Sequence, residues 1–293
     1  MAKREITIVI GTLNRPAVAA KLLKQIAADP RSTNWEILVF DQSDSKNYRL
    51  LKHEFQPFDS AQGKLIHLNE PNTCHYLNLG WQKAASPIVL YLDDDVELTK
   101  STIDSHLNAY RNPQILGVAG RVINNNDDYD VSIHHNRDTS RIKSFGAVID
   151  KNFASTNKSF IDFPYGCNMS FRKSILQKTG GFDEKLHGPI YAYNEVDLGY
   201  RISKKYPRSI VFEPEALVYH HRYPSGGTRH YSPAEIIKNT NFNYGYFIAK
   251  NFCWWQNILF WIRRLPYQLI REPGQTINIL KGFINGKFSI FNS

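Results

Sequence analysis

Four short apolar runs punctuate the first third of the chain, and each predicts a buried strand. The runs are continuous rather than alternating and are rich in β-branched and aromatic residues, at 6–10, 36–40, 65–68 and 88–92. A continuous apolar run is typical of a strand that is covered on both faces of a parallel sheet. Helix-like segments separate the runs, at 17–28, 50–55 and 77–84. Strands and helices that alternate in this way predict βαβ units and an open parallel sheet.

The pattern changes in the second third of the chain. A polar tract at 124–141, rich in Asn, Asp and His, predicts a long loop. The segments around this tract return to helix-like and strand-like patterns. We expect helices at 103–110, 173–179 and 195–205, and strands at 115–122, 145–149, 159–163 and on either side of Pro214.

From residue 252 onward, large aromatic side chains are interleaved with arginines, among them Trp254, Trp255, Arg263, Arg264 and Arg271. This mixture is typical of an amphipathic helix on an anionic membrane surface, where the rings lie at headgroup depth. A C-terminal helix that packs its tryptophans on the rest of the protein explains the same residues, and the sequence leaves both interpretations open. No segment approaches the roughly 18 apolar residues that a membrane span needs.

The composition indicates a folded protein without a disulfide framework. Of the 293 residues, 42% are hydrophobic and 22% are charged, which is typical of a folded protein rather than a disordered one. The 3 cysteines are far apart, which indicates neither a disulfide framework nor a Cys-x-x-Cys metal site. Because no apolar signal-peptide core follows Met1, we expect a cytoplasmic protein, either free or peripheral at the inner face of the plasma membrane.

The chain is basic, with 36 Lys and Arg against 27 Asp and Glu and a formal net charge of +9. The positive charge is spread along the chain and no nucleic-acid-binding signature accompanies it, so we expect no nucleic-acid partner. An anionic substrate such as a nucleotide, or an anionic membrane surface, accounts equally well for the excess.

Three consecutive carboxylates, Asp93, Asp94 and Asp95, follow directly on the apolar run at 88–92. Such groups repel one another, and a strand end offers no reason to gather them unless a cation is bound. In an extended segment Asp93 and Asp95 point the same way, so they can ligate one divalent ion while Asp94 faces elsewhere, for example a ribose hydroxyl. Oxygen ligands favour Mg²⁺ or Mn²⁺. The alternative is a solvated acidic turn.

Residues 92–96, together with 9–15 and 41–44 upstream, resemble the family 2 glycosyltransferases, which are inverting enzymes of the GT-A fold. The resemblance continues in order at 166–173, 180–184, 193–198 with Arg201, and 218–221, and so covers roughly residues 5–230. Each motif is weak alone, but this many in one order is a strong signal. The resemblance implies an α/β, Rossmann-like GT-A fold, whose mostly parallel central sheet is flanked by helices and followed by a C-terminal helical extension.

The same resemblance implies a division of the chain. We expect a GT-A glycosyltransferase domain at 1–231, made of a nucleotide-binding half at 1–100 and an acceptor-binding half at 101–231. A helical, aromatic and basic extension would follow at 232–293.

The resemblance also implies roles for individual residues. Asp93, Asp95 and His220 would hold a divalent metal, Mg²⁺ or Mn²⁺, with His221 as a rival to His220. Glu195 would be the catalytic base, because the family's acidic pair falls on 194–195 and its first member here is Asn194. A helix start keeps such a carboxylate ionised. Asp197 and Arg201 are four residues apart, which favours a structural salt bridge on a helix.

Further residues would contact the substrates. The glycine- and cation-rich segment 221–230 is expected to close over the diphosphate. Asn78 matches the family's Arg-Asn-x-Gly segment, with Leu77 in place of the arginine. Asp41 is placed to accept a hydrogen bond from the nucleotide base. The residues expected on the nucleotide sugar are Thr12, Asn14, Arg15, Asp41, Asn78, Asp93, Asp94, Arg222 and Thr228, and those on the acceptor or donor-sugar side are Gly166, Asn168 and Asn194.

These features predict a metal-dependent inverting glycosyltransferase of the rhamnosyl-, galactosyl- or glucosyltransferase kind. It would move a sugar from a UDP- or dTDP-linked donor to a hydroxyl of a glycan or lipid-linked acceptor, in the biosynthesis of a cell-surface polysaccharide. A nucleotidyltransferase is one alternative, although residues 11–16 hold only one glycine and one arginine for a phosphate loop. A non-catalytic glycan- or membrane-binding paralogue is another, although the aspartates and Glu195 are present.

Overall fold

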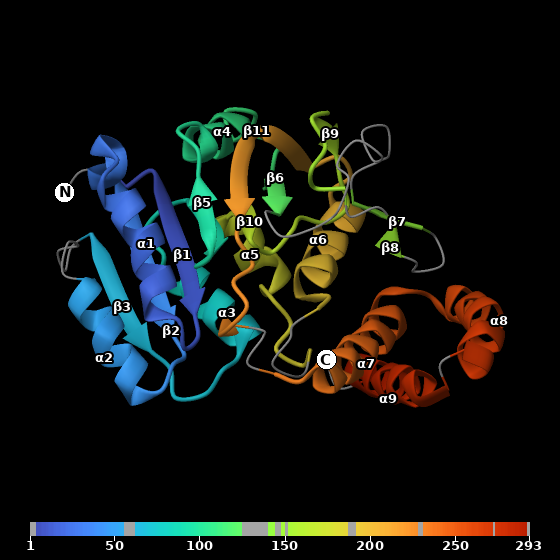
Figure 1. Ribbon diagram of the computed structural model, residues 1–293. Coiled ribbons are helices and arrows are strands. Elements are labelled where there is room, and N and C mark those ends of the chain that lie inside the picture. Colours follow the sequence, from blue (N-terminus) through green and yellow to red (C-terminus); the bar gives the residue numbers. More distant parts are fainter. Residues whose placement is uncertain are drawn as a thin grey trace.

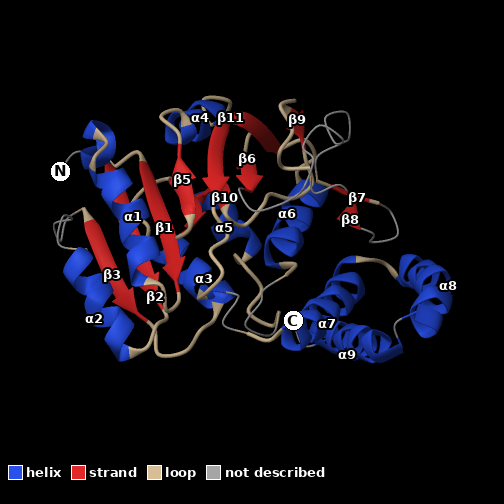
Figure 2. Cartoon of the chain, in the orientation of Figure 1, coloured by secondary structure: helices blue, strands red, loops and turns tan. Residues whose placement is uncertain are grey.

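The computed structural model describes residues 4–55, 62–124, 140–143, 148–149, 152–186, 192–227, 231–271 and 273–291. The protein has the α/β fold expected from the sequence, with a curled central sheet flanked by helices (Figure 2). The order of strands in the sheet is β3-β2-β1-β4-β10-β6-β11-β5, and β9 pairs with β11.

The first four strands are parallel and confirm the four apolar runs. They are β1 (Ile6–Thr12), β2 (Trp35–Asp41), β3 (Gly63–His67) and β4 (Ile88–Asp93). Three predicted helices connect them: α1 (Pro16–Ala27), α2 (Ser45–Glu54) and α3 (Thr73–Lys83), and the short 3₁₀ helix η1 (Pro30–Asn34) follows α1. Local chemistry sets the helix starts. Asp44 caps α2 by accepting from Lys46 and Asn47, and Asn72 caps α3.

The second half of the sheet is mixed. Strand β10 (Asn168–Arg172) lies antiparallel between β4 and β6 (Gly117–Asn124), while β11 (Ile210–His220) runs parallel to β6. The short strands β5 (Val96–Leu98) and β9 (Ser159–Phe160) are antiparallel to β11. Six strands of this sheet therefore point one way and three the other, which makes it mostly parallel, as expected.

One strand boundary differs from the prediction. The sequence predicted two strands around Pro214, but β11 is one strand whose register with β6 shifts between Glu213 and Val218. Pro214 has no N–H to donate, so it interrupts the ladder without ending the strand.

The remaining helices of this region agree with the prediction: α4 (Thr102–Ala109), α5 (Lys173–Thr179) and α6 (Asn194–Lys205). The separate ribbon of β7 (Arg141–Ile142) and β8 (Val148–Ile149) covers part of the expected strand at 145–149, and residues 145–147 lie outside the described residues. Residues 125–139 of the polar tract also lie outside them.

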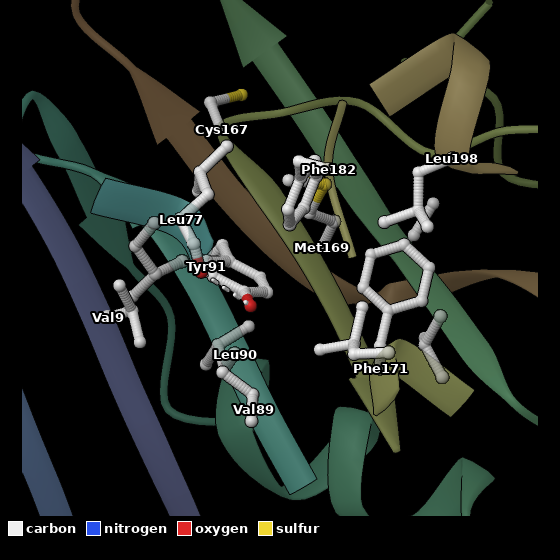
Figure 3. Packing of buried hydrophobic residues seen from close by; sticks show 14 of the residues in the cluster. Val9, Leu77, Val89, Leu90, Tyr91, Cys167, Met169, Phe171, Phe182 and Leu198 are labelled. Carbon is white, nitrogen blue, oxygen red and sulfur yellow. Dashed lines mark hydrogen bonds between the residues drawn. The ribbon is translucent and has the colours of Figure 1, made fainter. Parts of the chain in front are cut away.

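The core sits between the sheet and its helices and joins the two halves of the sheet. Figure 3 shows Leu90 and Tyr91 of β4 beside Met169 and Phe171 of β10, with Phe182 close to them. The rings of Tyr91 and Phe182 meet edge to face at 5.5 Å, and the buried Tyr91 hydroxyl donates to the backbone oxygen of Leu77 at 3.2 Å. This packing fixes the end of β4, where the aspartates follow.

Three helices complete the chain and confirm the C-terminal helical extension: α7 (Pro233–Asn251), α8 (Trp254–Arg271) and α9 (Pro273–Phe291). A capping box between Ser232 and Glu235 begins α7. In Figure 1, α7 and α9 lie side by side and α8 lies at the outer end of the group. Within the described part of the chain, none of the helices combines the length and the hydropathy that spanning a membrane requires. The division at 231 remains a prediction.

Candidate functional site

A cavity of about 350 Å³ opens at the carboxyl ends of β1, β4 and β11. This is the edge at which open α/β sheets bind their ligands, and the volume lies within the range of small-molecule sites. Nine residues singled out from the sequence line it, namely Thr12, Arg15, Asp93, Asp95, Gly166, Asn194, Glu195, His220 and Arg222.

The three aspartates differ in burial and in whether they line the cavity. Strand β4 ends at Asp93, and the chain turns through Asp94 and Asp95 before β5 begins. The Asp93 side chain keeps 41% of its surface exposed, whereas those of Asp94 and Asp95 are buried. Asp93 and Asp95 line the cavity and Asp94 does not.

Asp93, Asp95 and His220 form a group whose potential ligand atoms all lie within 4.8 Å of one another. The Nε2 atom of His220 is 3.1 Å from Oδ1 of Asp95 and 3.9 Å from Oδ2 of Asp93. Strand pairing places the imidazole there, because His220 is opposite Val96 of β5 and Asn124 of β6. His221 turns away and pairs with Glu97 at 2.9 Å. The geometry thus favours His220 over His221 as a ligand.

The chemistry of this group fits a divalent cation. Nδ1 of His220 is 3.1 Å from Oδ1 of Asn124, which can only accept, so Nδ1 is the donor. Nε2 then faces the two carboxylates, and in the neutral imidazole its lone pair would be available to a cation held between them. Metal-bound histidines commonly donate their other N–H in this way. Desolvation within the cavity and, after it, the charge of Asp95 raise the pKa of Asp93, as expected for neighbouring carboxylates.

Arg15 partly compensates this acidic cluster. Asp94 accepts from the Thr12 hydroxyl at 2.6 Å and from Nε of Arg15 at 2.9 Å, and Arg15 also pairs with Asp95 at 3.0 Å. Burial nevertheless raises the pKa of Asp94 to about 7, against the opposing effect of Arg15. The Asp94 oxygens face these protein donors, and its expected contact with the ribose stays a prediction.

A glycine turn lies directly on Arg15. Gly226 and Gly227 both have positive φ, and the Gly227 N–H donates to the Leu13 oxygen at 3.0 Å. A β-carbon on Gly227 would come within 2.8 Å of the Arg15 guanidinium. Glycine suits this position, because a side chain would be strained at this φ and would displace the Arg15 guanidinium. The described part of the predicted closing segment thus touches the acidic cluster through Arg15.

Glu195 lies in the first turn of α6 and lines the same cavity as the metal-binding group. Its backbone N–H donates to the Asn194 side chain at 2.6 Å. Asp197, on the next part of the helix, is fully buried and accepts from Arg201 at 2.8 Å and Lys250 at 3.0 Å. The expected salt bridge between Asp197 and Arg201 is therefore present, and Asp197 also connects α6 to α7.

Other predicted residues lie outside the cavity lining. Asn14 accepts from the backbone of Asp44 at 3.0 Å, and the buried Asp41 accepts from Ser43 at 2.8 Å, with burial raising its pKa. Asn78 donates to the Phe182 oxygen at 2.9 Å. 

Asn168 is also buried. Its side-chain amide donates to the backbone oxygen of Ala216, and its Oδ1 contacts Nε2 of His106. The side chains of Asn14, Asp41, Asn78 and Asn168 thus hydrogen-bond to other parts of the protein. Thr228 lies outside the described residues.

The structure adds cavity residues that the sequence did not assign to the site, including Pro71, Tyr76 and Tyr165; Gln42 of the motif at 41–44 also lines the cavity. Tyr76 packs against the end of β1, where a β-carbon on Gly11 would come within 2.3 Å of its ring. The ring of Tyr165 meets that of His220 edge to face at 6.4 Å. The only sequence signal for Tyr165 was its position directly before Gly166, because nothing local marks an aromatic residue as a wall of a site.

Comparison with known proteins identifies the family. The model of the glycosyl transferase family 2 matches residues 7–180, which is more than half of the chain. The chain belongs to this family. No curated protein matches it.

As a family 2 member, the chain resembles solved GT-A glycosyltransferases. One is the mannosyltransferase PcManGT from Pyrobaculum calidifontis, solved with GDP-Man and Mn²⁺, with 13% identity and a TM-score of 0.57 over 86% of this chain and 64% of that chain. Another is S. aureus TarS 1–349, solved with UDP-GlcNAc, with 14% identity and a TM-score of 0.59 over 84% and 65%. At these identities the likeness shows the GT-A fold alone, and the chain spans just under two thirds of the length of both.

Proposed function

We propose that this family 2 member is a metal-dependent inverting glycosyltransferase. It would transfer a sugar from a nucleoside diphosphate sugar, most simply UDP- or dTDP-linked, to a hydroxyl of a glycan or lipid-linked acceptor. The observation that carries the proposal is that Asp93, Asp95 and His220 line one cavity together with Glu195. PcManGT was solved with GDP-Man and Mn²⁺ and TarS with UDP-GlcNAc, which supports this class of donor.

Within this proposal, residues 1–100 supply most of the nucleotide site. Thr12, Arg15 and Asp93 line the cavity from the ends of β1 and β4, and residues 101–231 add the acceptor side through Gly166, Asn194 and Glu195. Arg222, also in the lining, is placed to pair with phosphate oxygens as a charge-assisted donor. A divalent cation held by Asp93, Asp95 and His220 would neutralise the charge of the departing diphosphate.

Glu195 would take the proton from the acceptor hydroxyl. Its place in the first turn of α6 favours the ionised form through the helix dipole, and substrate that excludes water from the cavity would make it a stronger base. A hydroxyl activated in this way attacks the anomeric carbon from the side opposite the diphosphate, which inverts the configuration. Arg15 keeps Asp95 in place through their 3.0 Å ion pair.

The first experiment identifies the donor. Nucleoside diphosphates and nucleotide sugars are screened by thermal shift with and without Mn²⁺, and one donor is expected to raise the melting temperature only when metal is present. Turnover of that donor should release a nucleoside diphosphate. Release of pyrophosphate would instead identify a nucleotidyltransferase, and the anomeric configuration of the product, read by NMR, tests inversion.

The second experiment tests the base. Glu195→Gln should lower kcat by at least about 10³-fold while the metal-dependent thermal shift with donor persists, because the carboxylate is lost but the donor site is not. Glu215→Gln, at an exposed position outside the cavity lining, is the matched control and should retain full turnover. Undiminished turnover in Glu195→Gln would assign the base to another residue.

A further inference from the structure

Helix α9 carries apolar side chains on two opposite faces. One face packs on α7 so closely that a β-carbon on Gly282 would come within 1.8 Å of the Phe242 backbone oxygen, and Ile279 is fully buried there. The other face exposes four large side chains to solvent: Ile277, Leu280, Ile284 and Phe288. At 3.6 residues per turn these four fall on one stripe opposite the packed face.

Helix α8 extends this exposed surface. Its residues Trp254, Trp255, Ile258 and Ile262 point to one side of the helix, and three of them form an apolar groove with Phe283 and Lys287 of α9. The term "apolar face" here denotes the eight exposed residues of α8 and α9, whose exposure ranges from 46% to 73%. Contiguous exposed apolar side chains of this size mark interaction surfaces, because water solvates them poorly.

Cations border the apolar face. On α9, Lys281 lies at one edge of the stripe and Lys287 at the other, since they are offset from its centre in opposite directions around the helix. Lys287 extends along the ring of Phe283, 5.6 Å from its centroid, and so keeps its ammonium group beside the groove. The surface is therefore both apolar and cationic.

We infer that the apolar face docks the protein on the surface of an anionic lipid bilayer. The exposed Trp254 and Trp255 would lie at headgroup depth, the aliphatic side chains would enter the acyl boundary, and Lys281 and Lys287 would contact lipid phosphates. Charge complementarity selects this occupant over a second copy of the chain. Two copies that met through this face in a symmetric dimer would set the same cations against one another.

Flotation with lipid vesicles tests the inference on the full chain. Vesicles of equimolar phosphatidylcholine and phosphatidylglycerol should bind the protein, and phosphatidylcholine vesicles should bind it at least about tenfold more weakly. The triple variant Ile262→Ser, Ile284→Ser, Phe288→Ser should lose binding to both. Ile237→Ser, Leu50→Ser changes exposed apolar residues outside the face and should bind as the unchanged protein does.

Charge is tested separately. Lys281→Gln, Lys287→Gln should weaken binding to anionic vesicles about 25-fold, at about fivefold for each cation near the surface, and should leave binding to neutral vesicles unchanged. Lys52→Gln, Lys64→Gln removes the same charge from exposed positions on α2 and β3 and should have no comparable effect.

Three results would overturn the inference. The first is absence of vesicle binding, and the second is equal binding to neutral and anionic vesicles. The third is a dimer in light scattering that the triple variant converts to a monomer, which would assign the face to a second copy of the chain. Vesicle binding needs neither donor nor metal, so each of these results leaves the proposed glycosyl transfer standing.

Discussion

At the scale of single residues, the aspartate cluster shows what a local rule can and cannot predict. The alternation of side chains along an extended segment predicted that Asp93 and Asp95 would share a side. Both line the cavity, but the chain turns at Asp94 and Asp95, so strand alternation is not what brings them together. The contact of Asp94 with Arg15 could not be predicted, because it joins residues 79 positions apart and depends on the β1–β4 pairing. A consecutive acidic motif therefore contains two kinds of aspartate.

Substitution of neighbouring aspartates should separate these kinds. Asp93→Asn should leave the free energy of unfolding without metal unchanged or raise it by up to about 1 kcal/mol, because it removes repulsion with Asp95. It should also abolish the stabilisation by Mn²⁺. Asp94→Asn should lower the free energy of unfolding by about 2 kcal/mol, because both Asp94 oxygens face Arg15 and the amide NH2 of Asn would meet the guanidinium donor against donor. Urea unfolding with and without Mn²⁺ measures both effects, and equal behaviour of the two variants would contradict this assignment.

The buried His106 predicts a specific pH dependence. Its ring nitrogens are 2.8 Å from the Ser170 hydroxyl and 2.9 Å from the Asn168 side chain, and burial lowers its pKa from 6.5 to about 4. The unfolded chain therefore binds a proton below pH 6.5 that the folded chain does not bind until about pH 4. Stability from this group is complete above pH 6.5 and is lost as the pH falls.

Between about pH 8 and about pH 5, this difference in proton binding should cost about 2 kcal/mol of the free energy of unfolding. The glutamine of His106→Gln cannot titrate in this range but can still hydrogen-bond. The free energy of unfolding of the variant should therefore fall by about 2 kcal/mol less over the same pH range, while other groups titrate as before. Chemical unfolding at both pH values gives the comparison. The same loss in both proteins would mean that His106 does not control it.

At the scale of elements, the type of most segments was predictable and their ends were less so. Apolar periodicity located α5 at its observed ends and β1 to β4 within a few residues. The helix at 50–55 begins earlier, at Ser45, because Asp44 supplies a cap that periodicity does not register. Proline usually ends a strand, so the sequence predicted two strands around Pro214. The pairing of β11 with both β5 and β6 keeps the strand continuous through this residue.

The contact of α7 with α9 should depend on glycine. Gly282→Ala would place a β-carbon within 1.8 Å of the Phe242 oxygen, so the helices must separate, and we expect a loss of at least about 2 kcal/mol in the free energy of unfolding. Gly274→Ala on the same helix meets nothing within 4 Å and should raise stability by up to about 1 kcal/mol through helix propensity. Thermal unfolding of both variants measures these changes. An unchanged stability of Gly282→Ala would show that α7 and α9 are not in close contact.

At the scale of the whole molecule, the composition of the sheet was predictable but its order was not. Continuous apolar runs predicted the buried parallel strands, and the motifs that resemble family 2 glycosyltransferases implied the GT-A fold. The insertion of the antiparallel strand β10 between β4 and β6 leaves no local trace, because it depends on which strand edges meet. The gathering of His220 with Asp93 and Asp95 follows from that order, so the sequence could assign His220 to the metal site only through the resemblance to a family.

The proposed division at residue 231 can be tested by calorimetry, because buried charges cross it. Asp197 of α6 is fully buried and depends on Lys250 and Asn251 of α7, and Lys250 also pairs with Asp183 at 2.6 Å. Separation of the helices would leave Asp197 with only part of its compensation. We therefore expect one cooperative unfolding transition for the whole chain.

Removal of the ion pair between Lys250 and Asp197 should lower the melting temperature of the whole chain. Lys250→Met should lower the unfolding midpoint by about 5 °C, corresponding to about 3 kcal/mol, because Asp197 then remains buried without one of its two cations. Lys238→Met, at an exposed position of the same helix, should leave the midpoint within about 1 °C. Two separate transitions, of which only one responds to Lys250→Met, would instead show that residues 232–293 unfold independently of the sheet.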